Sequence, residues 1–145
     1  MSTQESCSIR TAQSRDAEAL SALSAELGYP VPPDLMRERV TQFSTEHAVL
    51  VAEFDGRVIG WIDVGLSFHL QSGTRAEIGG LVVAADSRGR GIGSQLLERA
   101  EQWAKEKGVE EVLLRSNAKR TDAHRFYLRE KYTQTKTSAV FLKKL

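Results

Sequence analysis

The sequence lacks the features that would cross-link the chain or place it in a membrane. Cys7 is the only cysteine, which excludes an internal disulfide and metal sites built on paired cysteines. No apolar run approaches the roughly 18 residues that a membrane span requires. The first eight residues also lack the basic start and apolar core of a secretory signal. We therefore expect a soluble cytoplasmic protein with no membrane partner.

The length and composition are typical of one globular domain. The 145 residues are 41% apolar and 27% charged, and folding at this size buries roughly 68–70% of the surface of the unfolded chain. We expect a single domain over residues 1–145. The net charge of +1 indicates no polyanionic partner for the chain as a whole.

The charge is nevertheless uneven along the chain. Residues 1–80 contain six Lys and Arg against eleven Asp and Glu, a net charge of −5, whereas residues 81–145 contain fourteen against eight, a net charge of +6. An acidic half beside a basic half suits a site that holds a cation on one side and phosphates on the other. Solvated surface charge that happens to be distributed in this way is the alternative interpretation.

The spacing of apolar residues predicts an α/β fold. Strands are expected over about 8–12, 48–54, 58–66, 76–84, 111–115 and 132–142, and helices over about 15–27, 34–43, 92–107 and 121–130. We expect Ser14 to cap the first helix and Gly28 to end it, and Asp55-Gly56 is a strong hairpin signal. The order β-α-α-β-β-β-α-β-α-β predicts a central mixed sheet flanked by helices.

The most informative segment is the glycine-rich stretch over 84–94, between a buried strand and a long amphipathic helix. Glycines allow backbone N–H groups to converge on an anion, and the positive end of the helix dipole adds to the attraction. The loop does not fit two common nucleotide motifs, because it has no Gly-Lys-Ser/Thr and reads Gly89-x-Gly91-x-x-Ser94 rather than G-x-G-x-x-G. Two interpretations remain: the segment is a loop that binds a pyrophosphate, or it is a simple turn into a helix with no ligand.

The loop and its surroundings resemble one family. Arg88-x-x-Gly91-x-Gly93 is similar to the Q/R-x-x-G-x-G/A acetyl-CoA loop of the GCN5-related N-acetyltransferase (GNAT) superfamily. Four further segments resemble parts of the family's sequence and occur along the chain in the same order as in the family: 58–60, 81–83, 117 and 123–127. The stretches 66–70, 77–83 and 117–130 resemble the aminoalkylphosphonate N-acetyltransferases, and they recur in aminoglycoside-type enzymes. Lys131 departs from the pattern, because a glycine usually ends the last helix at this position.

The resemblance implies that acetyl-CoA is the co-substrate. It places the pantetheine beside the strand that ends at Val83. A bulge at Gly79-Gly80 would separate this strand from its neighbour, and the backbone N–H groups of the strand would then stabilise the oxyanion. We predict no metal, since His124 has no second histidine at helical ligand spacing. The implied acetyl-CoA contacts are Leu81, Val82, Val83, Arg88, Gly89, Arg90, Gly91, Ile92, Gly93, Ser94, Asn117, Arg120, Ala123 and Phe126.

Two residues are the candidates for the proton transfers of acetylation. An alkylammonium must lose a proton before it attacks a thioester, and Glu77 occupies the position of the general base in histone-type members of the superfamily. Asp63 and His69 are alternative bases, and a salt-bridge role for Glu77 is the other interpretation. Tyr127 matches the family's tyrosine acid, although protonating a thiolate from an ordinary tyrosine is uphill by roughly 2 kcal/mol. Tyr127 packing its ring in the core is the alternative.

The sequence thus predicts an acyltransferase that moves an acetyl group from acetyl-CoA to a primary amine of a small molecule by direct attack in a ternary complex. An aminoalkylphosphonate is one acceptor, with Arg75, Arg37 and Arg39 as candidates for its anionic group. The alternatives are an aminoglycoside, polyamine or protein N-acetyltransferase and a non-catalytic CoA-binding sensor. We expect no nucleic-acid partner, because basic and acidic residues are interleaved without an aromatic stacking motif. A homodimer through the terminal strands is a further expectation.

Overall fold

The computed structural model describes residues 7–42, 44–116 and 120–145. The chain divides into two compact units, residues 1–114 and residues 115–145, which we call the first and second unit. The expectation of a single domain over residues 1–145 stays a prediction. None of the helices formed by the described residues is long and apolar enough to cross a membrane.

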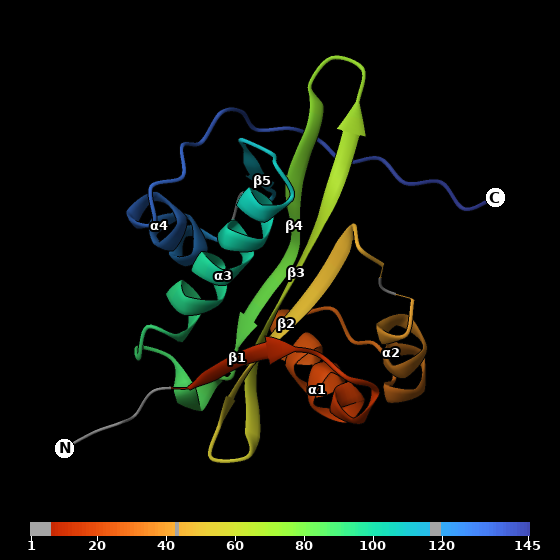
Figure 1. Ribbon diagram of the computed structural model, residues 1–145, viewed down its shortest axis with the longest axis vertical. Helices are drawn as coiled ribbons and strands as arrows, with labels where there is room; N and C mark the ends of the chain where they lie inside the picture. Colours follow the sequence, from red (N-terminus) through yellow and green to blue (C-terminus); the bar gives the residue numbers. More distant parts are fainter. Residues whose placement is uncertain (1–6, 43, 117–119) are drawn as a thin grey trace. The chain divides into compact units, whose positions relative to one another are not determined.

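The first unit is a five-stranded mixed sheet with helices on both faces. The strand order is β1-β2-β3-β4-β5; neighbours are antiparallel except β4 and β5, which are parallel. The predicted sheet with flanking helices is therefore confirmed (Figure 1). The elements are β1 Ser8–Thr11, η1 Ser14–Asp16, α1 Ala17–Leu27, α2 Pro33–Val40, β2 His47–Phe54, β3 Arg57–His69, β4 Gly73–Val83, η2 Ala85–Ser87, α3 Ile92–Glu106 and β5 Val112–Leu114.

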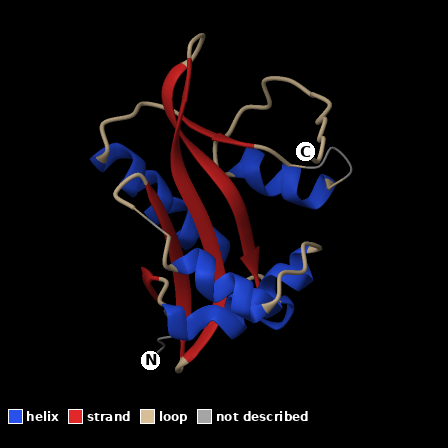
Figure 2. Cartoon of the chain, turned by 90° about the vertical axis from the view of Figure 1, so that its right-hand side faces the viewer, coloured by secondary structure: helices blue, strands red, loops and turns tan. Residues whose placement is uncertain are grey.

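Two hairpins join β2, β3 and β4 and set the register of the centre of the sheet. Asp55 and Gly56 both have positive φ, 53° and 77°, as a two-residue turn between twisted strands requires. The predicted hairpin at Asp55-Gly56 is confirmed. The β3–β4 hairpin is longer than expected and extends beyond the other elements of the first unit (Figures 1 and 2).

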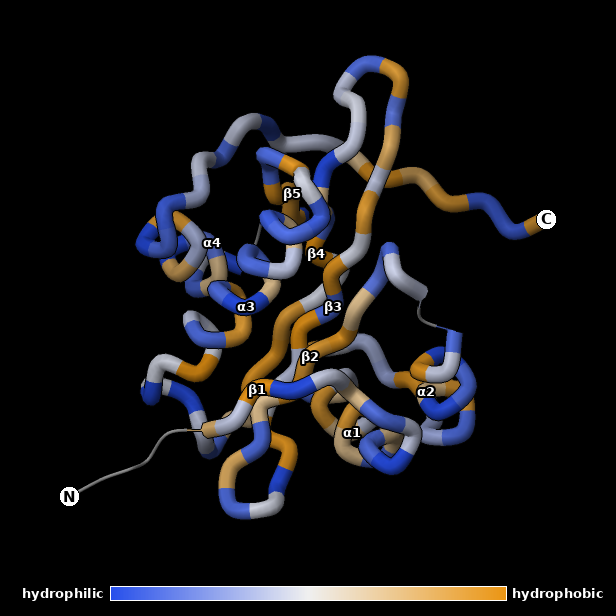
Figure 3. Tube along the Cα trace, in the orientation of Figure 1, coloured by the Kyte–Doolittle hydropathy of each residue, from blue (hydrophilic) through white to orange (hydrophobic). Residues whose placement is uncertain are grey.

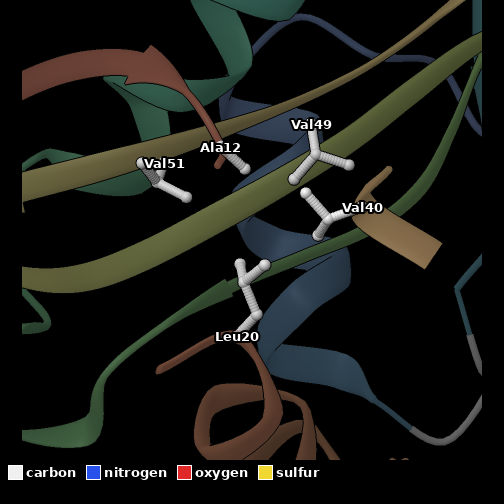
Figure 4. Close-up of a cluster of buried hydrophobic side chains, with 5 residues drawn as sticks. All are labelled: Ala12, Leu20, Val40, Val49 and Val51. Atoms are coloured by element: carbon white, nitrogen blue, oxygen red, sulfur yellow. The ribbon is translucent and has the colours of Figure 1, made fainter. Parts of the chain in front are cut away.

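The two faces of the sheet are covered by different helices. A Cβ on Gly60 would lie 3.1 Å from Leu96 Cδ1 of α3, whereas a Cβ on Gly80 would lie 3.9 Å from Leu27 Cδ2 of α1. The hydropathy colouring shows apolar residues concentrated in the central strands (Figure 3). On the face of α1 and α2, a buried cluster packs between helices and strands (Figure 4); it consists of Ala12, Leu20, Val40, Val49 and Val51.

The ends of α1 differ partly from the prediction. Gly28 ends α1 with φ 103°, as predicted. Ser14 does not cap the helix, and that prediction is wrong. A 3₁₀ turn over Ser14–Asp16 precedes α1, and the carboxylate of Asp16 accepts the backbone N–H of Gln13 at 2.8 Å. The N-cap of this turn is therefore Gln13, whose backbone N–H bonds to the carboxylate three residues later as in a capping box.

The described residues of the second unit form one helix, α4, over Thr121–Arg129, followed by a tail to residue 145. The predicted strand over 132–142 is wrong, because the tail contains no strand. Val140, Phe141 and Leu142 are 83–91% exposed. The strand preference of threonine and valine depends on packing against a neighbouring strand, and this segment has no strand partner among the described residues.

The end of α4 shows how the chain accommodates the missing glycine. Lys131 adopts the left-handed conformation with φ 78°. Its N–H donates to Leu128 O at 3.1 Å, and the N–H of Tyr132 donates to Tyr127 O at 3.0 Å. This is the bonding pattern of a helix end that normally contains glycine, so the lysine occupies it under modest strain.

Candidate active site

A bulge in β4 marks the centre of the candidate site. Asp63 of β3 pairs with Gly80 and Val64 pairs with Ile78, which leaves Gly79 as an extra residue on β4. The predicted bulge at Gly79-Gly80 is therefore confirmed. Among the described residues, β5 pairs with β4 over Ala76–Ile78 and no further. Beyond Ile78, the edge of β4 that faces away from β3 has no strand partner in the described part of the chain, so backbone groups there can bond to a bound molecule.

Glu77 lies two residues before the bulge on a half-exposed face of the sheet. The β4 residues before the bulge alternate in burial: Ala76 and Ile78 are buried, whereas Arg75 and Glu77 are partly exposed. Directly opposite Glu77 on β3 is Gly65. At this end of β4 the side chains of one face are therefore buried, whereas those of the other face, including Glu77, are partly exposed.

The glycine-rich loop connects the end of β4 to α3. Gly89 and Gly91 both have positive φ, 82° and 77°, and Gly91 is the residue from which α3 begins. The first helical hydrogen bond runs from Gln95 N to Gly91 O at 3.1 Å. The amides of the first turn therefore have no acceptor within the helix, and the helix dipole makes this end positive. The loop therefore offers backbone donors and a positive helix end of the kind that binds phosphate groups.

The loop is fastened to the sheet and to α1. Arg88 Nε donates to Val83 O at 3.1 Å, the amide of Ala84 donates to Ile59 O at 2.8 Å, and the amide of Ala85 donates to Glu26 Oε1 at 3.0 Å. The bond from Arg88 to Val83 therefore joins the two segments, 81–83 and 88–94, that contain most of the predicted acetyl-CoA contacts. Ile92 is 5% exposed, so its side chain packs in the core and it offers only its backbone to a ligand.

A histidine that the sequence did not single out lies on the same face of the sheet as Glu77, across β3 from it. His47 of β2 and Glu77 of β4 are both register partners of Gly65 on β3, so all three residues are on the same face. His47 Nε2 contacts Asp63 Oδ1. Counting pairs outward from the Asp55-Gly56 turn would have placed His47 opposite residues 63–65, so the hairpin register was the signal that could have found it.

Of the two alternative bases, only one lies near Glu77 in the structure. Asp63 is the register neighbour of the bulge, whereas His69 pairs with Gly73 at the far end of the hairpin. His69 is four residues from Gly65, which is about 13 Å along a strand. Asp63 therefore shares the site with Glu77, and His69 does not.

The remaining predicted site residues belong to the second unit. Arg120, Ala123, Phe126 and Tyr127 lie at the start of α4 or on it, and Asn117 lies outside the described residues. The Phe126 and Tyr127 rings meet edge to face at 5.3 Å between centroids. Burial raises the pKa of the Tyr127 hydroxyl, and the charge of Arg120 opposes that shift. A raised pKa makes proton donation to a thiolate costlier than for an ordinary tyrosine.

Among the described residues, no group of three or more His, Cys, Asp and Glu side chains is arranged to hold a metal ion. Glu77, Asp63 and His47 supply acceptors, and the glycine-rich loop supplies amide donors for an anion.

Comparison with known proteins identifies the family. Residues 16–131 match the acetyltransferase (GNAT) family. The chain is 37% identical over 135 residues to the aminoalkylphosphonate N-acetyltransferase of Salmonella typhimurium, an alignment that covers 89% of this chain and 86% of that protein. The chain therefore belongs to the GNAT family and is an acetyl-CoA-dependent acyltransferase.

Solved structures share the fold. The aminoglycoside N-acetyltransferase AAC(6')-Iy in complex with CoA superimposes with a TM-score of 0.87 at 19% identity, covering 100% of this chain and 99% of that one. A transcriptional regulator from Bacillus halodurans C-125 superimposes with a TM-score of 0.83 at 25% identity, covering 94% and 99% of the two chains. The predicted GNAT fold is therefore confirmed.

Proposed function

We propose that this chain acetylates the primary amine of a small molecule, with Glu77 as the general base and direct attack of the amine on the acetyl thioester. The observation that supports this is the position of Glu77, two residues before the β4 bulge on the half-exposed face of the sheet. The same strand leads directly into the loop that suits the phosphates of acetyl-CoA.

The order of chemical events follows from the protonation state of the acceptor. An alkylamine with a pKa near 10.4, as in lysine, is mostly ammonium at neutral pH. Glu77 removes one proton, directly or through water, so that the nitrogen lone pair attacks the carbonyl carbon. A C–N bond forms, the C–S bond breaks, and the electron pair leaves on sulfur. Backbone N–H groups of 81–83 stabilise the negative oxygen.

Tyr127 is the proposed acid that protonates the departing thiolate. Its raised pKa keeps the hydroxyl protonated at neutral pH, which an acid requires. Burial raises the cost of the transfer, and the charge of Arg120 reduces it, as would any further cation that the bound substrates bring. Acetyl-CoA contacts by Asn117, Arg120, Ala123 and Phe126 belong to the same proposal.

The acceptor that we propose is an aminoalkylphosphonate. The Salmonella relative carries that activity in its name, and Arg75 lies on the same face as Glu77, two residues earlier on β4. Two residues along a strand span about 7 Å, which suits a short molecule with an ammonium group at one end and a phosphonate at the other. Arg37, which pairs with Asp34 at 2.9 Å, and Arg39 are the alternative anion contacts.

The proposal is tested by free-thiol release from acetyl-CoA with a panel of amines. The panel contains aminoalkylphosphonates, polyamines, amino sugars, aminoglycosides and peptides with free N-termini. We expect turnover with the aminoalkylphosphonates and a loss of kcat/KM of about a hundredfold or more in Glu77→Gln. Glu110→Gln is the matched control, because Glu110 is exposed between α3 and β5.

A second variant tests the acceptor. Arg75→Ala should raise KM for an aminoalkylphosphonate about tenfold or more, and it should leave KM for a polyamine, which has no anionic group, unchanged. Turnover confined to aminoglycosides, polyamines or peptides would replace the proposed acceptor. Tight CoA binding without turnover on any amine would instead favour a non-catalytic CoA sensor. The cytoplasmic location and the homodimer stay predictions.

A further inference from the structure

The acceptor nitrogen must lose two protons during the reaction. An ammonium and an acetyl thioester become an amide, a thiol and one released proton, so one proton ends on sulfur and the other in solvent. A carboxylate that has taken the first proton cannot take the second until it has released the first. A second acceptor beside Glu77 removes that constraint. This inference rests on the proposed function.

The structure places a second ionisable pair next to Glu77. Asp63 lies two residues before Gly65 on β3, on the same face as His47 and Glu77. The carboxylate of Asp63 contacts His47 Nε2 through Oδ1, and its Oδ2 lies 2.8 Å from the place where a Cβ of Gly79 would be. The carboxylate therefore occupies the space that the bulge glycine leaves.

The imidazole of His47 is oriented across β3 towards β4. Its Nδ1 lies 3.3 Å, and its Cγ 3.4 Å, from the position that a Cβ on Gly65 would take. The ring thus lies over Gly65, whose other register partner is Glu77. Because Nε2 faces a carboxylate, the neutral ring has its proton on Nε2 and its lone pair on Nδ1. The proton-accepting nitrogen of the neutral ring is thus Nδ1, which lies over Gly65, the register partner of Glu77.

Both side chains of the pair reach solvent. His47 is 43% exposed and Asp63 is 33% exposed, so a small amine can approach the ring and a proton can leave it. The charged groups around the ring are Asp63 beside it, Glu77 and Arg75 on β4, and Glu46, which precedes it in the chain. Three of these four groups are acidic, and their negative charge favours a cationic acceptor.

We propose that His47 is a second catalytic base and that Asp63 is its positioning residue. Glu77 takes the first proton from the ammonium, and the nitrogen forms its bond to the carbonyl carbon. The nitrogen is then positively charged again, and His47 Nδ1 takes its second proton as the C–S bond breaks. Asp63 holds the imidazolium through Nε2 until the proton passes to water.

The test uses free-thiol release with the amine that gives the highest kcat/KM in the panel above. His47→Ala should lower kcat about a hundredfold, with KM within about threefold of the wild type. Added imidazole should restore kcat of His47→Ala about tenfold, and it should not help Asp63→Asn. Gly65→Ala should lower kcat with unchanged KM, because its methyl group displaces the ring from a contact of 3.3 Å.

Two matched variants control the experiment. His69→Ala removes a histidine from the far end of the same strand, and Asp55→Asn changes a carboxylate in the distant turn, where asparagine tolerates positive φ. Both should keep wild-type kcat. Thermal unfolding of every variant separates loss of chemistry from loss of folded protein.

The outcomes distinguish this inference from the proposed function. A wild type that acetylates no amine of the panel refutes the proposed function, and the inference with it. An active wild type with an inactive Glu77→Gln, but with His47→Ala and Asp63→Asn within about twofold of their controls, overturns the inference alone. A loss in His47→Ala that imidazole does not rescue, accompanied by equal destabilisation, assigns the pair a structural role and overturns it too.

Discussion

Replacing Asp16 with asparagine tests the ion pair that joins the start of α1 to the sheet. Asp16 is 4% exposed, and its two oxygens accept Arg10 Nη1 at 2.8 Å and Arg10 Nη2 at 2.9 Å. One of them also accepts the amide of Gln13 at 2.8 Å. The hydrogen bonds from Arg10 hold the pKa of this carboxyl below its usual range, against the opposing effect of burial.

The expected loss can be worked out from these bonds. Asparagine keeps one acceptor oxygen but loses the negative charge and the bidentate contact. A hydrogen bond to a charged group contributes about 1.5–3 kcal/mol. Arg10 retains Glu53 through Nε at 2.8 Å, so its charge keeps a partner. We expect Asp16→Asn to lower the free energy of unfolding by about 2–3 kcal/mol and Tm by about 4–12 °C.

The assay is urea unfolding followed by circular dichroism between pH 7 and pH 3. Because the folded-state pKa of Asp16 is lowered, its stabilisation is present above the unfolded pKa and is lost as the pH falls through the folded pKa. The difference between wild type and variant should therefore shrink below about pH 4.

Asp34→Asn is the matched control for this prediction. Asp34 pairs with Arg37 at a similar distance, 2.9 Å, but its side chain is 98% exposed. An exposed pair contributes less than about 1 kcal/mol. Equal losses in the two variants, or a difference between Asp16→Asn and wild type that does not change with pH, would refute the reasoning from buried charge.

Two further predictions concern the second unit. Tyr127→Phe should lower turnover about tenfold or more, measured at saturating substrates where chemistry limits the rate; unchanged turnover there removes the acid role. Lys131→Gly should raise the free energy of unfolding by about 0.5–1 kcal/mol, since relief of left-handed strain of about 1–2 kcal/mol exceeds the entropy that glycine adds to the unfolded chain. Urea unfolding that shows no gain would contradict a strained helix end.

Local chemistry made much of the first unit predictable. The helix over 92–107 has a regular apolar stripe, and the structure has it as Ile92–Glu106. The Asp55-Gly56 turn needs positive φ at both residues, and a pair of glycines within a strand is a local signal of a bulge. These signals lie within a few residues of the structure that they specify, so one sequence was enough to place them.

Features that depend on distant partners were not predictable in this way. Asp16 displaced Ser14 at the start of α1 because Arg10, on a separate strand, holds its carboxylate. The tail had the composition of a strand but no strand to pair with among the described residues. His47 and Asp63 are sixteen residues apart in the chain, and their contact follows from the hairpin register rather than from any local pattern.

Two glycines at the candidate site leave room for neighbouring side chains that a larger residue would displace. A regular sheet face would have a side chain at residue 65 between His47 and Glu77, and it would separate them. Glycine there allows the imidazole to lie over the strand, where a Cβ would approach Nδ1 to 3.3 Å. Glycine at 79 likewise accommodates the carboxylate of Asp63, whose Oδ2 would be only 2.8 Å from a Cβ. The proposed second base therefore depends on Gly65 and Gly79 as directly as on the histidine itself.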